Sequence, residues 1–163
     1  MYKTLKVLPL AILSLTIAAC SSTKLDDANN VASVEAQNAQ GYDPIDDPKT
    51  PVFGKRSIFF QFDSYSIAPE YASTISAHAA YIKGSQNHKV YVILQGNTDD
   101  RGTAEYNLAL GQRRSESVKR ALLSQGVSES QLEAVSFGKE KPINTAQNEA
   151  AFKENRRVDF VYQ

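Results

Sequence analysis

Two charged residues, Asp99 and Arg114, stand at positions where their side chains could carry chemistry. Arg114 falls within a long helical pattern, in the middle of an apolar stripe that Leu110, Val118 and Leu122 define. Because an unpaired buried charge is costly, this guanidinium requires an acid or a ligand as its partner. Alternatively, its aliphatic stem follows the core while the charged head reaches solvent at an edge.

Asp99 is the natural counterpart of Arg114, because it lies in the turn 96–102 between a predicted strand and that helix. Ligands of α/β proteins collect at the carboxyl ends of strands. We therefore expect Asp99 and Arg114 to face one crevice. Two interpretations are open: the residues form an internal salt bridge, or they bind the opposite charges of one ligand.

Two further charged residues lie close to predicted strands. Arg156 begins the closing strand and shares a face with Val158 and Phe160, which makes it a core-facing cation and a structural partner for an acid in a turn. Asp63 follows the first predicted strand, where a turn or helix-capping role and a role in a site are equally consistent with the sequence.

The elements that must position these residues follow from apolar periodicity and from Gly and Pro punctuation. The expected strands cover residues 57–62, 89–95, 132–137 and 156–162, and the expected helices cover 69–83, the stretch from Thr103 up to Gly126, and 146–154. The order βαβαβ(α)β predicts a two-layer α/β domain in which helices pack on a mixed β-sheet.

The N-terminal segment has the features of an export signal. Residues 1–19 combine two lysines with an apolar run and end in small residues, as a secretory signal peptide does. The only cysteine of the chain, Cys20, directly follows Ala18-Ala19, and this arrangement resembles the lipobox of bacterial lipoproteins. The resemblance implies cleavage before Cys20 and covalent lipid on it, which would hold the protein at a membrane. The alternative is an ordinary signal peptide followed by an unmodified cysteine.

The composition divides the exported part of the chain in two. Residues 21–50 carry a surplus of acids and few apolar side chains, which predicts a flexible periplasmic tether, and residues 51–163 remain for one folded domain. The whole chain has 18 basic and 18 acidic residues, a balance that disfavours nucleic acid as a partner. One cysteine and two histidines exclude a disulfide framework and the common zinc modules, so no cofactor beyond the lipid is expected.

Several motifs together resemble the OmpA-like peptidoglycan-binding domains. They are Asn97-Thr98-Asp99-Asp100-Arg101-Gly102 in the turn, Leu110-Gly111-Gln112-Arg113-Arg114 in the helix, and Asn155-Arg156-Arg157-Val158 at the closing strand. With Phe60-Gln61-Phe62-Asp63 and the lipobox, the resemblance narrows to the family of peptidoglycan-associated lipoproteins. It covers residues 57–163, and the signal and tether also fit.

The resemblance implies a site for the peptide stem of peptidoglycan, chiefly its meso-diaminopimelate. Asp99 would bind the ammonium and Arg114 the carboxylate at the end of that side chain. Further implied contacts come from Phe62, Asp63, Asn97, Thr98 and Leu110. Without ligand, Asp99 and Arg114 are expected to pair with each other or with water, and replacing either is expected to leave the domain folded.

The resemblance also implies a non-catalytic role at the cell envelope. It places the protein at the outer membrane, lipid-anchored and facing the periplasm, where it ties the membrane to the wall. It further implies membership of the Tol system, with TolB docking on or beside the wall-binding face. Two alternative functions are consistent with an envelope location. An enzyme acting on the wall is disfavoured, because neither histidine has a visible Cys or Ser partner; an envelope protein-interaction module without direct wall binding stays open.

Overall fold

The computed structural model describes residues 42–85 and 90–163. The predicted signal peptide 1–19, Cys20 and residues 21–41 of the tether lie outside the described residues. The strands are β1 (Ser57–Phe59), β2 (Val92–Asn97), β3 (Leu132–Gly138) and β4 (Arg157–Tyr162). The helices are α1 (Ala72–Gly84), α2 (Ala104–Ser124) and α3 (Glu149–Asn155), with short 3-10 turns at η1 (Pro69–Tyr71) and η2 (Glu129–Gln131).

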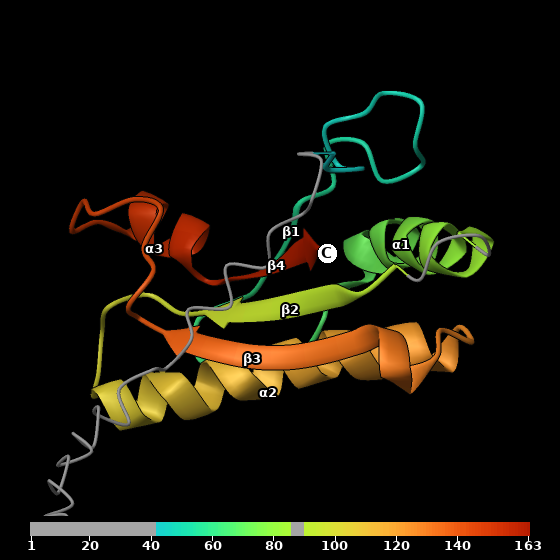
Figure 1. Ribbon diagram of the computed structural model, residues 1–163. Coiled ribbons are helices and arrows are strands. Elements are labelled where there is room, and N and C mark those ends of the chain that lie inside the picture. The colour runs from blue at the N-terminus through green and yellow to red at the C-terminus, as the bar shows by residue number, and fades with distance from the viewer. Residues whose placement is uncertain (1–41, 86–89) are drawn as a thin grey trace, which may run out of the picture. The chain divides into compact units, whose positions relative to one another are not determined.

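The four strands form one mixed sheet in the order β1-β4-β2-β3. Strand β4 runs antiparallel to both β1 and β2, whereas β2 and β3 are parallel. Helix α2 extends along β2 and β3, and α3 lies near the end of β2 from which the chain leaves toward α2 (Figure 1). The predicted α/β class and the mixed sheet are confirmed. β1 ends at Phe59 and is shorter than the expected strand, because the carbonyl groups of Gln61 and Ser64 beyond it accept from Arg114 of α2 instead of from a neighbouring strand.

The core lies between one face of the sheet and helices α1 and α2. Alternate residues of the strands point into it, as the period of two in a strand requires. The largest contributors are fully or almost fully buried: Ile58, Leu94, Val118, Leu122, Val158 and Phe160. No helix in the ranges 42–85 and 90–163 is long and apolar enough to cross a membrane.

Helix α2 packs directly against the backbone of β2. A β-carbon on Gly96 would collide with the carbonyl group of Gly111, and one on Gly111 would collide with the hydroxyl of Ser136. Glycine at these two positions therefore permits a helix-to-strand approach that no larger residue allows. This contact fixes α2 against the carboxyl end of β2. It therefore also fixes the position of Arg114, which α2 carries, relative to the sheet.

The folded part begins earlier than the sequence predicted. Residues 42–50, assigned to the tether, form turns in which Ile45 is only 2% exposed and contributes to the core together with Val52. Arg56 forms ion pairs of 3.1 Å with Asp43 and with Asp46, and these pairs hold the turns against the domain. The boundary at residue 50 was wrong because a single apolar residue within an acidic segment gives no periodic signal.

A buried histidine joins three parts of the domain. His78 of α1 lies 2.6 Å from the hydroxyl of Tyr162 and 2.7 Å from the carbonyl oxygen of Lys55, and its ring stacks on Phe160. Because the carbonyl oxygen can only accept, Nε2 carries the proton and Nδ1 accepts from Tyr162. Burial lowers the pKa of His78 to about 4, so the imidazole is neutral at physiological pH.

Acidification from pH 7 to pH 4.5 is expected to destabilise the fold through His78. The unfolded side chain takes up a proton near its ordinary pKa of 6.5, whereas the folded one does so only near about 4. The free energy of unfolding therefore falls by up to about 3 kcal/mol as the pH decreases from about 6.5 toward about 4. Urea unfolding of the protein and of His78→Gln measures it: the variant should lose much less over the same range, and an equal loss would contradict the assignment.

Candidate functional site

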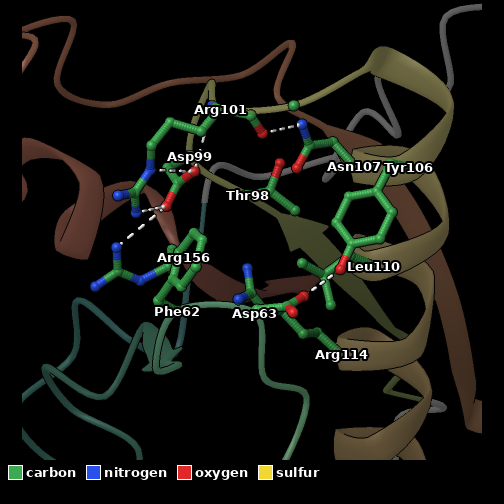
Figure 2. Close-up of a pocket in the computed structure, with 11 residues that line it drawn as sticks. Phe62, Asp63, Thr98, Asp99, Arg101, Tyr106, Asn107, Leu110, Arg114 and Arg156 are labelled. Carbon is green, nitrogen blue, oxygen red and sulfur yellow. Dashed lines mark hydrogen bonds and ion pairs between the residues drawn. The ribbon is translucent and has the colours of Figure 1, made fainter.

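A pocket of about 270 Å³ opens where β2, α2 and the segment after β1 converge. It lies at the carboxyl end of β2, as the turn 96–102 predicted, and Figure 2 shows side chains from all three elements directed toward it. The residues that line it are Phe62, Asp63, Thr98, Asp99, Arg101, Gly102, Tyr106, Asn107, Leu110, Arg114 and Arg156. Six of the seven residues implied for the site therefore border one cavity.

Asp99 forms a buried ion-pair network with two arginines, and Arg114 is not one of them. Its Oδ2 accepts from Arg101 Nη2 at 2.7 Å and from Arg156 Nη1 at 3.1 Å, while Oδ1 accepts from the backbone N–H and from Nε of Arg101. Burial acts to raise the pKa of Asp99, but the hydrogen bonds from Arg101 and Arg156 outweigh it and hold the pKa below its usual range. The carboxylate is thus charged and fully engaged. Of the two interpretations left open by the sequence, the internal salt bridge between Asp99 and Arg114 is therefore wrong.

Arg114 is held by backbone carbonyl groups from three directions. Its Nε donates to Ser64 at 2.8 Å, Nη1 to Asn97 at 3.0 Å and Nη2 to Gln61 at 3.1 Å. Its place on the apolar face of α2 is confirmed, because the side chain is 0% exposed. Burial, with the like charge of Arg156, lowers the pKa of Arg114 to about 10, which still leaves the guanidinium charged at neutral pH.

These bonds use three of the five N–H donors of the Arg114 guanidinium within the part of the chain that the structure describes. The remaining donors, one on each terminal nitrogen, match the two oxygens of a carboxylate. Since Arg114 borders the pocket but is shielded from solvent, a direct ligand contact requires a movement of the pocket wall. Its positive potential acts in the pocket without such a movement.

Two neighbouring residues at the end of β2 have different roles. Asn97 does not line the pocket; its side-chain amide donates to Gln95 and Asp159, and only its carbonyl oxygen serves the site, by holding Arg114. Thr98 does line it, and its hydroxyl is buried without a hydrogen-bond partner among the described residues. An unpaired buried hydroxyl is unfavourable, so Thr98 is a ready contact for a polar ligand.

Asp63, in the segment after β1, and Tyr106, on α2, both line the pocket and contact each other. The hydroxyl of Tyr106 donates to the carboxylate of Asp63, which links the segment after β1 to α2 (Figure 2). Asp63 adopts a positive φ of 51°, an uncommon conformation that Asp tolerates better than most residues. Leu110 and Phe62 supply the apolar surface, and Phe62 is largely exposed at the mouth.

Sequence reasoning missed Arg101 as a pocket residue and identified Arg156 only as a structural cation. Arg156 indeed pairs with an acid in a turn, Asp99, and also with Glu149 of α3 at 2.8 Å. Arg101 stands two residues after Asp99, a spacing at which a turn can fold the two side chains together, so a local signal existed. The guanidinium of Arg101 lies over the rings of Phe62 and Phe152, at 4.3 and 4.5 Å from their centres.

The pocket therefore combines three arginines, two aspartates and an unpaired hydroxyl on a partly apolar wall. Such a set suits a small ligand group that carries both charges, because each sign finds a fixed counterpart. No group of three or more His, Cys, Asp or Glu side chains within residues 42–85 and 90–163 is placed to hold a metal ion.

Comparisons with known proteins identify the family. Residues 59–156 match the OmpA family. The peptidoglycan-associated lipoprotein of Haemophilus influenzae is 43% identical over 99% of this chain and 100% of its own length, and that of Pasteurella multocida is 40% identical over the same shares. The chain belongs to the OmpA family and, within it, to the family of peptidoglycan-associated lipoproteins.

Solved structures agree with this assignment. The crystal structure of the peptidoglycan-associated lipoprotein from Burkholderia pseudomallei has a TM-score of 0.69 and 51% identity, and the match covers 74% of this chain and 100% of that chain. The C-terminal domain of Helicobacter pylori MotB has a TM-score of 0.60 over 65% of this chain and 81% of that one. At 24% identity, the second likeness supports the fold alone.

Replacing Arg114 is expected to destabilise the domain, contrary to the expectation from the sequence. Arg114→Ala removes the donors of three carbonyl groups and leaves a cavity, which should lower the free energy of unfolding by about 3 kcal/mol or more. Arg114→Lys keeps the charge and part of the volume and should lose less. Chemical denaturation measures both, with the exposed neighbour Arg113→Ala as a control that should change stability by about 0.5 kcal/mol at most. Equal stability of Arg114→Ala and the control would contradict the structural role.

Proposed function

We propose that this protein binds peptidoglycan without catalysing a reaction and ties the outer membrane to the cell wall. Its ligand is the side-chain end of meso-diaminopimelate in the stem peptide, which carries one ammonium and one carboxylate. The observation that carries the proposal is the pocket itself, in which Asp99 and Arg114 offer opposite charges from the end of β2 and from α2. The names of the relatives, peptidoglycan-associated lipoproteins, support peptidoglycan as the binding partner.

Each end of the ligand has a counterpart in the pocket. Asp99 binds the ammonium, because its carboxylate stays charged at physiological pH. The carboxylate of the ligand pairs with the free donors of Arg114 once the pocket lining that shields them has moved. The unpaired hydroxyl of Thr98 gives a further hydrogen bond. Phe62 and Leu110 cover the aliphatic part of the side chain. A fork-shaped guanidinium is better suited than an ammonium to fix a carboxylate.

The remaining parts of the chain complete the tether. We assign a covalent lipid to Cys20, which places the protein in the outer membrane on its periplasmic side, and residues 21–41 span the gap to the domain. In this position the protein would serve envelope integrity and cell division as a component of the Tol-Pal system, with TolB docking on or beside the wall-binding face. The exposed side chains of Phe62, Tyr65 and Tyr106 support a protein contact there, since aromatic residues are enriched in interfaces.

An envelope protein-interaction module without wall binding is the second candidate. The same exposed aromatic side chains favour it. Such a module binds no small ligand, and the buried hydroxyl of Thr98 would then gain no hydrogen-bond partner. Binding of a free stem peptide to the purified protein distinguishes the two candidates.

Asp99→Asn is expected to weaken binding to isolated diaminopimelate-type peptidoglycan by about 10- to 100-fold, because a hydrogen bond between charged groups is lost. Co-sedimentation of the detergent-solubilised full-length protein with purified wall measures it. The matched control is Asp100→Asn, an exposed neighbour whose side chain bonds Gln147 and does not line the pocket. Equal sedimentation of both variants would reject the site, and loss of binding in both would show that the effect is not specific to Asp99.

Cys20→Ala is expected to release the exported protein from the membrane. Two or more acyl chains give lasting anchorage, whereas the described helices offer no alternative span. Fractionation of cells that express either form, followed by immunoblotting, measures the membrane-bound share. Retention of Cys20→Ala in the membrane fraction, with wall binding removed by the additional Asp99→Asn substitution, would contradict lipidation.

A further inference from the structure

Arg101 occupies the position at Asp99 that a ligand ammonium would need. The Asp99 carboxylate accepts three hydrogen bonds from Arg101 and one from Arg156, and its side chain is only 5% exposed. A carboxylate has about four acceptor positions, so this one is saturated in the domain without ligand. A cationic ligand can reach Asp99 only by replacing one of the two arginines.

The two arginines differ in how firmly they are held. The side chain of Arg156 is 2% exposed, and it also donates to Phe60 and Glu149. Removing it from Asp99 would leave a charge unpaired in the interior, which is strongly unfavourable. The side chain of Arg101 is 39% exposed and lies at the pocket rim, so it can leave at much lower cost.

A second acidic residue, Glu149, lies close enough to pair with Arg101. Nη1 of Arg101 lies 3.6 Å from Oε2 of Glu149, whose side chain is 53% exposed and does not line the pocket. The guanidinium also lies over the rings of Phe62 and Phe152, so contacts with two aromatic rings accompany its contacts with the two acids. Arg101 therefore has two possible acidic partners within reach of its present position.

We propose that Arg101 is an internal stand-in for the ligand ammonium, which moves from Asp99 to Glu149 when the ligand binds. This exchange rests on the proposed function, because it assumes a ligand with a cationic group. It keeps the charges balanced at each step: the ligand ammonium replaces one guanidinium at Asp99, and that guanidinium pairs with Glu149. Arg101 competes with the ligand, and Glu149 assists binding although it does not itself line the pocket.

The exchange gives the two residues opposite effects on affinity. Arg101→Met keeps an unbranched side chain beside the two rings but removes the competing charge, so binding should become about three- to tenfold tighter. Glu149→Gln removes the second partner and should weaken binding by a similar factor. In the double variant Arg101→Met/Glu149→Gln, the effect of Glu149→Gln should disappear, because no arginine remains to be received.

Isothermal titration with the tripeptide L-alanyl-γ-D-glutamyl-meso-diaminopimelate tests the exchange on the detergent-solubilised full-length protein. The matched controls are Arg120→Met, Glu116→Gln and their double variant, since these residues form an exposed ion pair on α2 away from the pocket. The controls should bind as the unaltered protein does, and thermal unfolding of each variant reports whether it is folded at the titration temperature.

The outcomes separate this proposal from the proposed function. If the unaltered protein binds the tripeptide and Arg101→Met binds it tighter, with no further effect of Glu149→Gln in that background, the exchange is supported. Weaker or unchanged binding by Arg101→Met would overturn the exchange and make Arg101 a direct ligand contact or a bystander, while the wall-binding function stands. If the unaltered protein does not bind the tripeptide at all, both proposals fail.

Discussion

A guanidinium buried in the apolar face of a helix is the constraint on which the rest of the structure depends. Arg114 of α2 donates to Gln61 and Ser64 in the segment after β1 and to Asn97 at the end of β2. These are the elements whose side chains enclose the pocket. Because the charge cannot remain unpaired in the interior, the folded state must bring all three together. The stability of the domain and the shape of its site thus have one cause.

The other charged side chains of the pocket form a second set of interactions, in addition to those of Arg114. Arg156 is fixed between Asp99 and Glu149, which links the turn after β2 to α3. Arg101 shares both acids but remains partly exposed. The buried pair sets the position of the Asp99 carboxylate, and the exposed arginine keeps that carboxylate neutralised when no ligand is present. This division gives every charge of the proposed site a partner within the protein itself.

Local patterns in the sequence predict the positions of some of these buried charges. The period of a helix places Arg114 on the buried stripe, and alternation in a strand places Arg156 toward the core. The partners of Arg114 were not predictable, because backbone carbonyl groups distant in sequence leave no residue-type signal. Asp99 was matched to the wrong arginine although Arg101, only two residues away, gave a local signal. Ile45 was missed since it is a single apolar residue in an acidic stretch, and only its packing shows that the domain begins before residue 50.

We propose above all that the pocket recognises a group with both charges. The most direct measurement compares the affinity of the protein for two stem tripeptides that differ only in the third residue, meso-diaminopimelate or L-lysine. Lysine keeps the ammonium that Asp99 would bind but lacks the carboxylate that would pair with Arg114. We expect the lysine peptide to bind about 10- to 100-fold more weakly, because the arginine donors stay unpaired. Equal affinities for the two peptides would contradict the account.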